Sequence, residues 1–418
     1  CDSLYYLGEV LVQSEESVLG IAEEQEVLEM IPSIPIYSNN ATNLYVISKR
    51  KLEELGYSAT WKHIYVINEA ETGSKVASRL WIADYVSRKS NGEVYTFEDL
   101  AQMSGTEKVG MQRLGVLRAD VDNLGAAFIS GFISDTKENP YHFNTFSRYA
   151  DLSRTLSMFF KVGVSKIVSG NVNGVEDVKD TYRLWSKDTS EKGHIHIIYS
   201  GGDDVFLVGP WDELIEVAID IRNRLKDLTG GKITMSAGLG MFTHNFPITK
   251  MAEITGKLES TAKDMPEKDS IALFGFDTEN EGNAPRCRHV YTWDRFVQSV
   301  LGEKFNMLQS ILAISKEGPI SDSSKMTFTR STMYRIMELL EEIIGNDLET
   351  IHRARLLYTL SRMEPERASE AQLEAYRKFI SMMYEHTNDK ESTRELLTAI
   401  HIVIYSLREK GKREEYHG

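Results

Sequence analysis

A short polar turn between two apolar segments constrains the fold of this chain more than any other feature. The turn is Gly201-Gly202-Asp203-Asp204, with apolar residues 194–199 before it and 205–209 after it. Short segments rich in Ile, Val, Phe and Tyr are typical of strands. The glycines allow the positive φ angles of a tight turn and leave room for a ligand to approach the backbone. The pattern therefore predicts a hairpin whose tip carries two carboxylates.

Strand and helix patterns alternate around this hairpin. The order is β-α-β-β-α-β followed by α-β, which is typical of a ferredoxin-like or palm arrangement. We therefore expect an α+β palm domain over residues 111–280, with the polar residues 170–193 as an inserted loop. The expected strands are 113–121, 194–199, 205–209, 232–242 and 270–274, and the expected helices are 144–169, 210–228 and 247–264. One face of the first helix should carry Phe146, Tyr149, Leu152, Leu156, Phe159 and Phe160.

The regions on either side of the palm show different patterns. Residues 1–110 contain short segments typical of strands, at 33–37, 43–48 and 62–67, and an acidic stretch at 15–29 that is either a helix or a loop. We expect a β-rich linker domain there. Residues 295–418 carry apolar stripes at helical spacing, which predict a helical bundle with a charged tail at 408–418. These stripes are Met333, Ile336, Met337, Leu340 and Ile343-Ile344, then Leu356, Leu357 and Leu360, then Leu396, Leu397, Ile400, Ile404 and Leu407.

Composition excludes several classes of protein. The formal net charge of -14 argues against a protein that coats nucleic acid with a broad basic surface. No apolar run approaches the roughly 18 residues of a membrane span. Two cysteines cannot form a disulfide framework, so a reducing cytoplasm is expected. Cys1 is either the last member of a metal-binding cysteine group that lies upstream or a chance terminal cysteine.

The predicted topology gathers carboxylates at one edge of the sheet. In a ferredoxin-like sheet the spatial strand order is usually 4-1-3-2, so strand one ends beside the turn before strand three. Strand one ends in Asp120-Val121-Asp122, and that turn holds Asp203 and Asp204. Hard cations such as Mg²⁺ prefer oxygen ligands of this kind. Two metals about 3.5–4 Å apart would serve attack of a 3′-hydroxyl on an α-phosphate with release of pyrophosphate.

The alternative is a solvated hairpin turn without chemistry. Two observations argue against it: the flanking strands are strongly apolar, and repulsion among so many carboxylates is unfavourable without a cation.

Other candidate residues each have two readings. Lys263, at the end of helix 247–264, either binds triphosphate or complements the helix dipole. Ser200 either hydrogen-bonds a base edge or is an ordinary strand-end serine. Asn123 either binds base or ribose or caps the following helix. His194 and His196 share a strand face, where a packed or solvated pair is favoured over a metal pair.

At these residues the chain resembles the large subunit of type III CRISPR–Cas effector complexes, in the Csm (type III-A) branch. The matching stretches are residues 97–104 (FEDLAQMS), 114–125 (LGVLRADVDNLG), 199–208 (YSGGDDVFLV) and 234–263, with TMSAGLGMF and the closing TAK. Residues 354–362, in a predicted helix, also resemble this family.

The resemblance implies synthesis of cyclic oligoadenylates from ATP with two Mg²⁺ (or Mn²⁺) ions, switched on by target RNA. It implies that Asp120, Asp203 and Asp204 are metal ligands, that Gly201, Gly202 and Lys263 contact triphosphate, and that Ser200 contacts adenine. Such subunits also have an HD nuclease domain, a first palm and a zinc-containing linker. We expect this chain to lack the first two, and to work with that N-terminal half, with backbone and small helical subunits, and with guide and target RNA.

Two rival functions remain open at this point. A diguanylate cyclase would read guanine and usually has Glu-Phe where this turn continues Asp-Val-Phe. A non-catalytic scaffold would bind ATP without turning it over, although the intact carboxylates argue against it.

Overall fold

The computed structural model describes residues 81–105, 110–133, 140–169, 182, 184, 193–276, 287–312, 314–315, 318–319, 330–346, 348–364 and 368–407, and the backbone of five strands between residues 5 and 80. The acidic stretch 15–29, Cys1, most of the expected loop 170–193 and the tail 408–418 lie outside these ranges. None of the described helices is both long enough and apolar enough to cross a membrane.

A six-stranded sheet forms the centre of the molecule. Its strand order is β11-β10-β9-β6-β8-β7. The inner part, β9-β6-β8-β7, confirms the predicted 4-1-3-2 order. The strands β6 to β9 pair antiparallel, whereas β10 adds to β9 in parallel. Their bounds are Leu114–Val121 for β6, His196–Gly201 for β7, Asp204–Pro210 for β8, Met235–Phe242 for β9, Ser270–Phe274 for β10 and Val290–Thr292 for β11.

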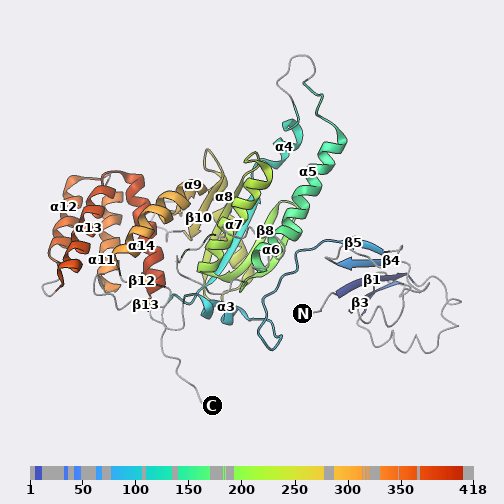
Figure 1. Ribbon diagram of the computed structural model, residues 1–418, viewed down its shortest axis with the longest axis horizontal. Coiled ribbons are helices and arrows are strands. Elements are labelled where there is room, and N and C mark those ends of the chain that lie inside the picture. Colours follow the sequence, from blue (N-terminus) through green and yellow to red (C-terminus); the bar gives the residue numbers. More distant parts are fainter. Residues whose placement is uncertain are drawn as a thin grey trace, which may run out of the picture.

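Helices cover both faces of this sheet (Figure 1). The first face packs against α7, Trp211–Thr229, and against a continuous helical run made of α5, Phe146–Met158, a π-helical turn, Phe159–Gly163, and α6, Val164–Ser169. The second face packs against α3, Phe97–Met103, and α8, Ile248–Lys263. Gly230 ends α7 in the left-handed conformation, which glycine adopts without strain. The α+β palm fold expected from the sequence is therefore confirmed.

The first turns of α5 correct one prediction. Leu156, Phe159 and Phe160 are buried as expected, but Phe146 is 87% exposed. Figure 1 shows why: α5 begins beyond the edge of the sheet, beside α4, Leu124–Ser130. There Tyr149 packs against the rings of Phe128, in α4, and Phe132, just after α4, instead of against the core. Helical periodicity indicates a face but not how far the partner surface reaches.

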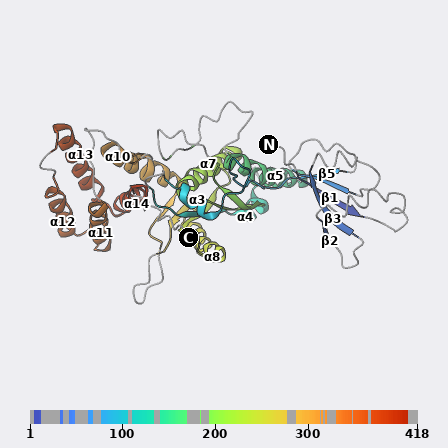
Figure 2. The ribbon, with the colours of Figure 1, turned by 90° about the horizontal axis from the view of Figure 1, so that it is seen from below.

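The N-terminal strands form a separate five-stranded sheet, ordered β2-β3-β1-β4-β5. Figure 2 shows it at one end of the molecule, with the C-terminal helices at the other. The strands predicted at 33–37, 43–48 and 62–67 are confirmed as β2, β3 and β4, whereas β1 and β5 were not predicted. Their bounds are Tyr5–Leu11, Ser33–Pro35, Thr42–Ser48, His63–Ile67 and Ala77–Leu80.

The C-terminal region is helical, and the predicted apolar stripes supply its core, although Ile344 and Leu357 are only half-buried. Met333, Ile336, Leu340, Leu356 and Ile400 all lie in one apolar core that continues without interruption from the first face of the sheet. The elements are α9, Trp293–Arg295, a π-helix, Phe296–Phe305, α10, Asn306–Ile311, the short strands β12, Ile314–Ser315, and β13, Gly318–Pro319, then α11, Arg330–Gly345, α12, Thr350–Ser361, α13, Glu370–His386, and α14, Lys390–Leu407.

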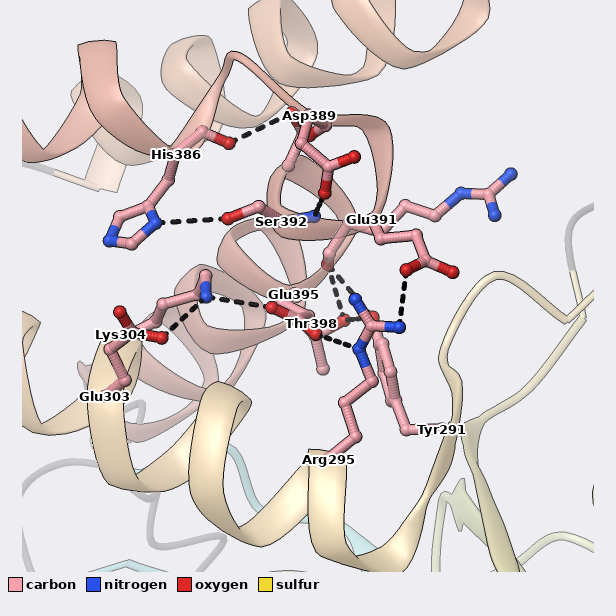
Figure 3. Close-up of polar contacts among 12 residues, drawn as sticks. Tyr291, Arg295, Glu303, Lys304, His386, Asp389, Glu391, Ser392, Glu395 and Thr398 are labelled. Atoms are coloured by element: carbon pink, nitrogen blue, oxygen red, sulfur yellow. Dashed lines mark hydrogen bonds and ion pairs between the residues drawn. The ribbon is translucent and has the colours of Figure 1, made fainter. Parts of the chain in front are cut away.

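A buried ionic cluster joins these helices (Figure 3). The Nζ of Lys304 lies 2.8 Å from the Oε2 of Glu395, and the two side chains are only 2% and 4% exposed. Arg295 also pairs with Glu395. Close by, the hydroxyl groups of Tyr291 and Thr398 are 2.6 Å apart and tie β11 to α14. The bundle is thus fixed to the edge of the sheet by polar contacts as well as by apolar packing.

Candidate functional site

Two neighbouring strands bring carboxylates to one edge of the central sheet. Asp120, near the end of β6, is the direct cross-strand partner of Asp204, the first residue of β8. The turn before β8 contains Gly202 with φ of 68°, and the carbonyl oxygen of Asp203 accepts a hydrogen bond from the backbone amide of Val121 at 3.1 Å. The structure therefore brings Asp120, Asp203 and Asp204 together as the topology predicted.

The helix α8 adds a lysine to this edge. The ammonium of Lys263 forms an ion pair with the Oδ2 of Asp120 and lies 3.3 Å from the Oε1 of Glu259. The other oxygen of Glu259 lies 3.4 Å from the Nε of Arg118. Arg118 and Asp120 are two residues apart on β6 and so project from the same face of the sheet.

Sequence reasoning found Lys263 but missed Arg118 and Glu259. Two spacings could have indicated them: Glu259 is four residues before Lys263 on a helix, and Arg118 is two residues before Asp120 on a strand.

Close packing of α8 on β9 sets the position of the lysine. A Cβ atom added to Gly238 would lie 2.4 Å from the backbone nitrogen of Glu259 and 2.6 Å from the carbonyl oxygen of Thr255. Only glycine therefore lets the helix approach the sheet this closely. A Cβ on Gly256 would in turn lie 3.0 Å from the guanidinium of Arg118, so this glycine makes room for the arginine.

The charges at this edge perturb one another. Burial raises the pKa of Asp204, and the charges of Asp203 and Asp120 raise it further, against the hydrogen bond from Tyr199. Burial opposes the charge of Lys263, but its hydrogen bond with Asp120 and the negative charges beside it raise the pKa above its ordinary value. Anionic charge is therefore in excess here.

Asp122 was expected as a fourth carboxylate of this cluster, but its side chain has other partners. Its Oδ2 accepts hydrogen bonds from the Oγ1 of Thr234 at 2.9 Å and from the backbone amide of Asp269 at 3.0 Å. The residue is 5% exposed. Asp122 therefore ties the starts of β9 and β10 together.

Ser200 is buried, and its hydroxyl donates a 2.6 Å hydrogen bond to the carbonyl oxygen of Phe160 in the π-helical turn. Asn123 occupies the N-cap position of α4, as one of the two predicted alternatives has it, but it adopts the left-handed conformation and its side chain makes no cap bond. The Oδ1 of Asn123 instead accepts a 2.6 Å hydrogen bond from the Nζ of Lys268.

His196 is the first residue of β7, whereas His194 precedes the strand and does not lie in it as predicted. Both have structural partners, which confirms the preference for a packed pair. The Nδ1 of His196 accepts a hydrogen bond from the backbone amide of Ser87 at 3.1 Å, and its Nε2 lies 2.7 Å from the carbonyl oxygen of Tyr95. His194 lies 3.3 Å from a carboxylate oxygen of Glu213.

The donor set at the edge has the chemistry that a hard divalent cation requires. Asp120, Asp203, Asp204 and Glu259 carry four negative charges against the two positive charges of Arg118 and Lys263. Among the described residues, no group of three or more His, Cys, Asp or Glu side chains is arranged so that it could hold a metal ion as it stands. The ammonium of Lys263 neutralises Asp120 in this arrangement.

Comparison with known proteins gives consistent matches. Residues 113–272 match the second palm domain of Cas10/Cmr2, and residues 322–409 match the second helical domain of the CRISPR RNA silencing complex Cmr2 subunit. The chain is 34% identical over 347 residues to the CRISPR system single-strand-specific deoxyribonuclease Cas10/Csm1 (subtype III-A) of Mycobacterium tuberculosis, which covers 83% of this chain and 37% of that protein. The Cas10/Csm1 protein of Streptococcus thermophilus is 29% identical over 389 residues, or 93% of this chain and 43% of that protein. The chain thus spans less than half the length of these relatives.

Solved structures show the same fold. A Csm1–Csm4 subcomplex of the type III-A CRISPR-Csm interference complex aligns with a TM-score of 0.62 at 23% identity, over 97% of this chain and 48% of that chain. A Csm1–Csm4 cassette in complex with cA4 aligns with a TM-score of 0.64 at 22% identity, over 97% and 49%. The chain therefore belongs to the Cas10/Csm1 family of type III-A CRISPR large subunits, and it carries a Cas10-type second palm followed by a Cmr2-type second helical domain.

Proposed function

We propose that the edge formed by β6 and β8 binds ATP with Mg²⁺ (or Mn²⁺) and serves the synthesis of cyclic oligoadenylates. The observation that carries this proposal is the register that sets Asp120 directly opposite Asp204. In the reaction, a 3′-hydroxyl loses its proton, its oxygen bonds to the α-phosphorus of a second ATP, and pyrophosphate leaves.

Three carboxylates of this chain would hold the metal: Asp120, Asp203 and Asp204. The bound metal would neutralise the phosphates and lower the pKa of the attacking hydroxyl. Gly201 and Gly202 let the triphosphate approach the backbone of the turn, and Lys263 supplies a positive charge to its oxygens.

The hydrogen bond of Ser200 bears on the choice of base. Its hydroxyl proton is given to Phe160, so the oxygen can only accept a further hydrogen bond. The exocyclic amino group of adenine donates at that position, whereas the corresponding oxygen of guanine only accepts. Ser200 is thus suited to adenine, and Asn123 is the second candidate for contact with base or ribose.

Related proteins support the proposal. Similar Csm1–Csm4 cassettes have been solved with AMPPNP, with pppApApA and with one ATP. By analogy, this chain would work with a Csm4-type backbone subunit, small helical subunits, guide RNA and target RNA. A first palm and an HD domain would come from an N-terminal half. The chain would divide into a linker domain at 1–110, a palm at 111–280 and a helical domain at 295–418, and the complex would act in the cytoplasm.

The test is ATP turnover by the complete complex with target RNA. Replacing Asp203 and Asp204 with Ala should abolish cyclic product while the complex still assembles, because loss of the metal removes charge stabilisation in the transition state. Asp151→Ala, an exposed aspartate on α5, is the matched control and should leave turnover unchanged.

Each rival function predicts a different outcome of this test. A diguanylate cyclase would turn over GTP in preference to ATP. A scaffold would bind ATP without product in the wild-type complex. Normal product from the double variant would overturn the assignment of the site.

A further inference from the structure

One buried carboxylate beside the site is held between two cations. Glu259 is 8% exposed, and its two oxygens contact different partners: the Oε1 lies 3.3 Å from the Nζ of Lys263, and the Oε2 lies 3.4 Å from the Nε of Arg118. Burying a carboxylate is costly unless it is paired. A glutamate at this position of α8 therefore costs more free energy than an apolar residue that would only pack against the sheet.

The same helix offers an ordinary ion pair for comparison. Glu253 and Lys257 are also four residues apart, with the Oε1 and Nζ atoms at 3.2 Å, but both side chains are about half exposed or more. That pair contacts solvent and the helix surface. The Glu259 pair instead lies at the edge of the sheet, where Lys263 reaches Asp120.

Metal binding and the observed ion pair compete for the same carboxylate. Lys263 occupies the Oδ2 of Asp120, one of the two oxygens of a carboxylate that the proposed function assigns to the metal. A cation bound at this oxygen would displace the ammonium. A lysine side chain released from its partner is flexible and strongly hydrated, so without a second anchor it would leave the site.

We propose that Glu259 is a positioning residue that retains Lys263 at the site when the metal takes Asp120. The ammonium turns from Asp120 to a phosphate oxygen while it stays bound to Glu259, and Arg118 fixes the carboxylate from its other side. This inference rests on the proposed function, because it assumes that metal and triphosphate bind at this edge.

Two consequences distinguish this role from simple support of the helix. First, Glu259 acts on ATP only through Lys263, so the effects of the two residues are coupled. Second, Lys263 competes with metal in the absence of nucleotide, so its removal should strengthen metal binding there.

The experiment measures equilibrium binding of Mg²⁺–ATP and, without nucleotide, of Mn²⁺ by paramagnetic resonance, both on the assembled complex. Glu259→Gln should weaken ATP binding roughly tenfold, as expected for one charge-assisted contact. In the Lys263→Met background the same change should have little effect. Lys263→Met alone should tighten Mn²⁺ binding severalfold. Glu253→Gln is the matched control and should change neither.

Several outcomes would overturn the inference. Equal effects of Glu259→Gln with and without Lys263, or no effect on ATP binding, would show that Glu259 only supports the fold. Should Glu259→Gln fail to fold, Arg118→Gln takes its place, with the same expected coupling to Lys263. A wild-type complex that binds no ATP would instead contradict the proposed function itself.

Discussion

The hydrogen bond between Ser200 and Phe160 leads to a sharp prediction on nucleotide choice. Because the hydroxyl proton is given to the carbonyl oxygen of Phe160 at 2.6 Å, the proposed contact with the base would use the serine oxygen as an acceptor, which suits the amino group of adenine and not the oxygen of guanine. In Ser200→Ala, ATP loses one hydrogen bond and GTP loses one unfavourable contact. We expect the ratio of kcat/KM for ATP over GTP to fall about tenfold, equivalent to about 1.4 kcal/mol.

The same substitution has a separate effect on stability. It leaves the carbonyl of Phe160 without its side-chain donor, which should lower the free energy of unfolding by about 0.5–1.5 kcal/mol. Ser165→Ala is the matched control, because the hydroxyl of Ser165 also donates to a carbonyl oxygen, that of Lys161, in the same helical run. It should leave selectivity unchanged and cost little stability, because a serine that bonds back to the carbonyl four residues earlier gains little over alanine in a helix.

The assay is steady-state turnover of each nucleotide by the target-bound complex, alongside thermal unfolding. A variant that loses stability but keeps full preference for ATP would refute the reasoning. Adenine would then be read elsewhere, with Asn123 as the next residue to test.

Three further predictions concern stability and electrostatics. Gly238→Ala should lower stability by about 1–3 kcal/mol through overpacking against α8, measured by urea unfolding, whereas Gly125→Ala meets nothing within 4 Å and should not destabilise. Asp204→Asn should raise the Tm in metal-free buffer at neutral pH, because the raised pKa of Asp204 means that its ionised form destabilises the folded state. The increase in Tm should vanish near pH 4 or below, where the carboxyl is protonated. An increase in Tm that did not change with pH would contradict this. Glu395→Ala should cost about 3–5 kcal/mol by leaving the ammonium of Lys304 without its buried partner, while removal of both charges should cost less in a double-mutant cycle.

The order of the central strands could be predicted from the sequence because it depends on patterns that extend over whole segments. Apolar runs bounded by glycines predicted the strands, and the alternation of strands and helices favoured the ferredoxin-like strand order. Asp120 and Asp204 could be assigned to the same edge of the sheet without coordinates for this reason, whereas their direct pairing is seen only in the structure. The helices of the C-terminal bundle could be predicted equally well, since apolar residues such as Met333 and Ile336 repeat at helical spacing.

The side-chain contacts around the site could not be predicted in the same way. The pair of Glu259 with Arg118 depends on how closely α8 approaches the sheet, which Gly238 decides. Charged residues are usually exposed, so nothing in the sequence distinguishes the buried Glu395 from its neighbours. Phe146 shows the opposite error, because an apolar pattern continued past the edge of the surface that buries it.

The central claim is that Asp120 and Asp204 hold a metal ion that binds triphosphate. The most direct measurement is anomalous diffraction from crystals of the complex with Mn²⁺ and a non-hydrolysable ATP analogue. We predict a manganese peak about 2 Å from oxygens of both aspartates, with the ammonium of Lys263 on a phosphate oxygen. Manganese bound away from β6 and β8, with Lys263 still paired to Asp120, would contradict the assignment of this edge as the nucleotide site.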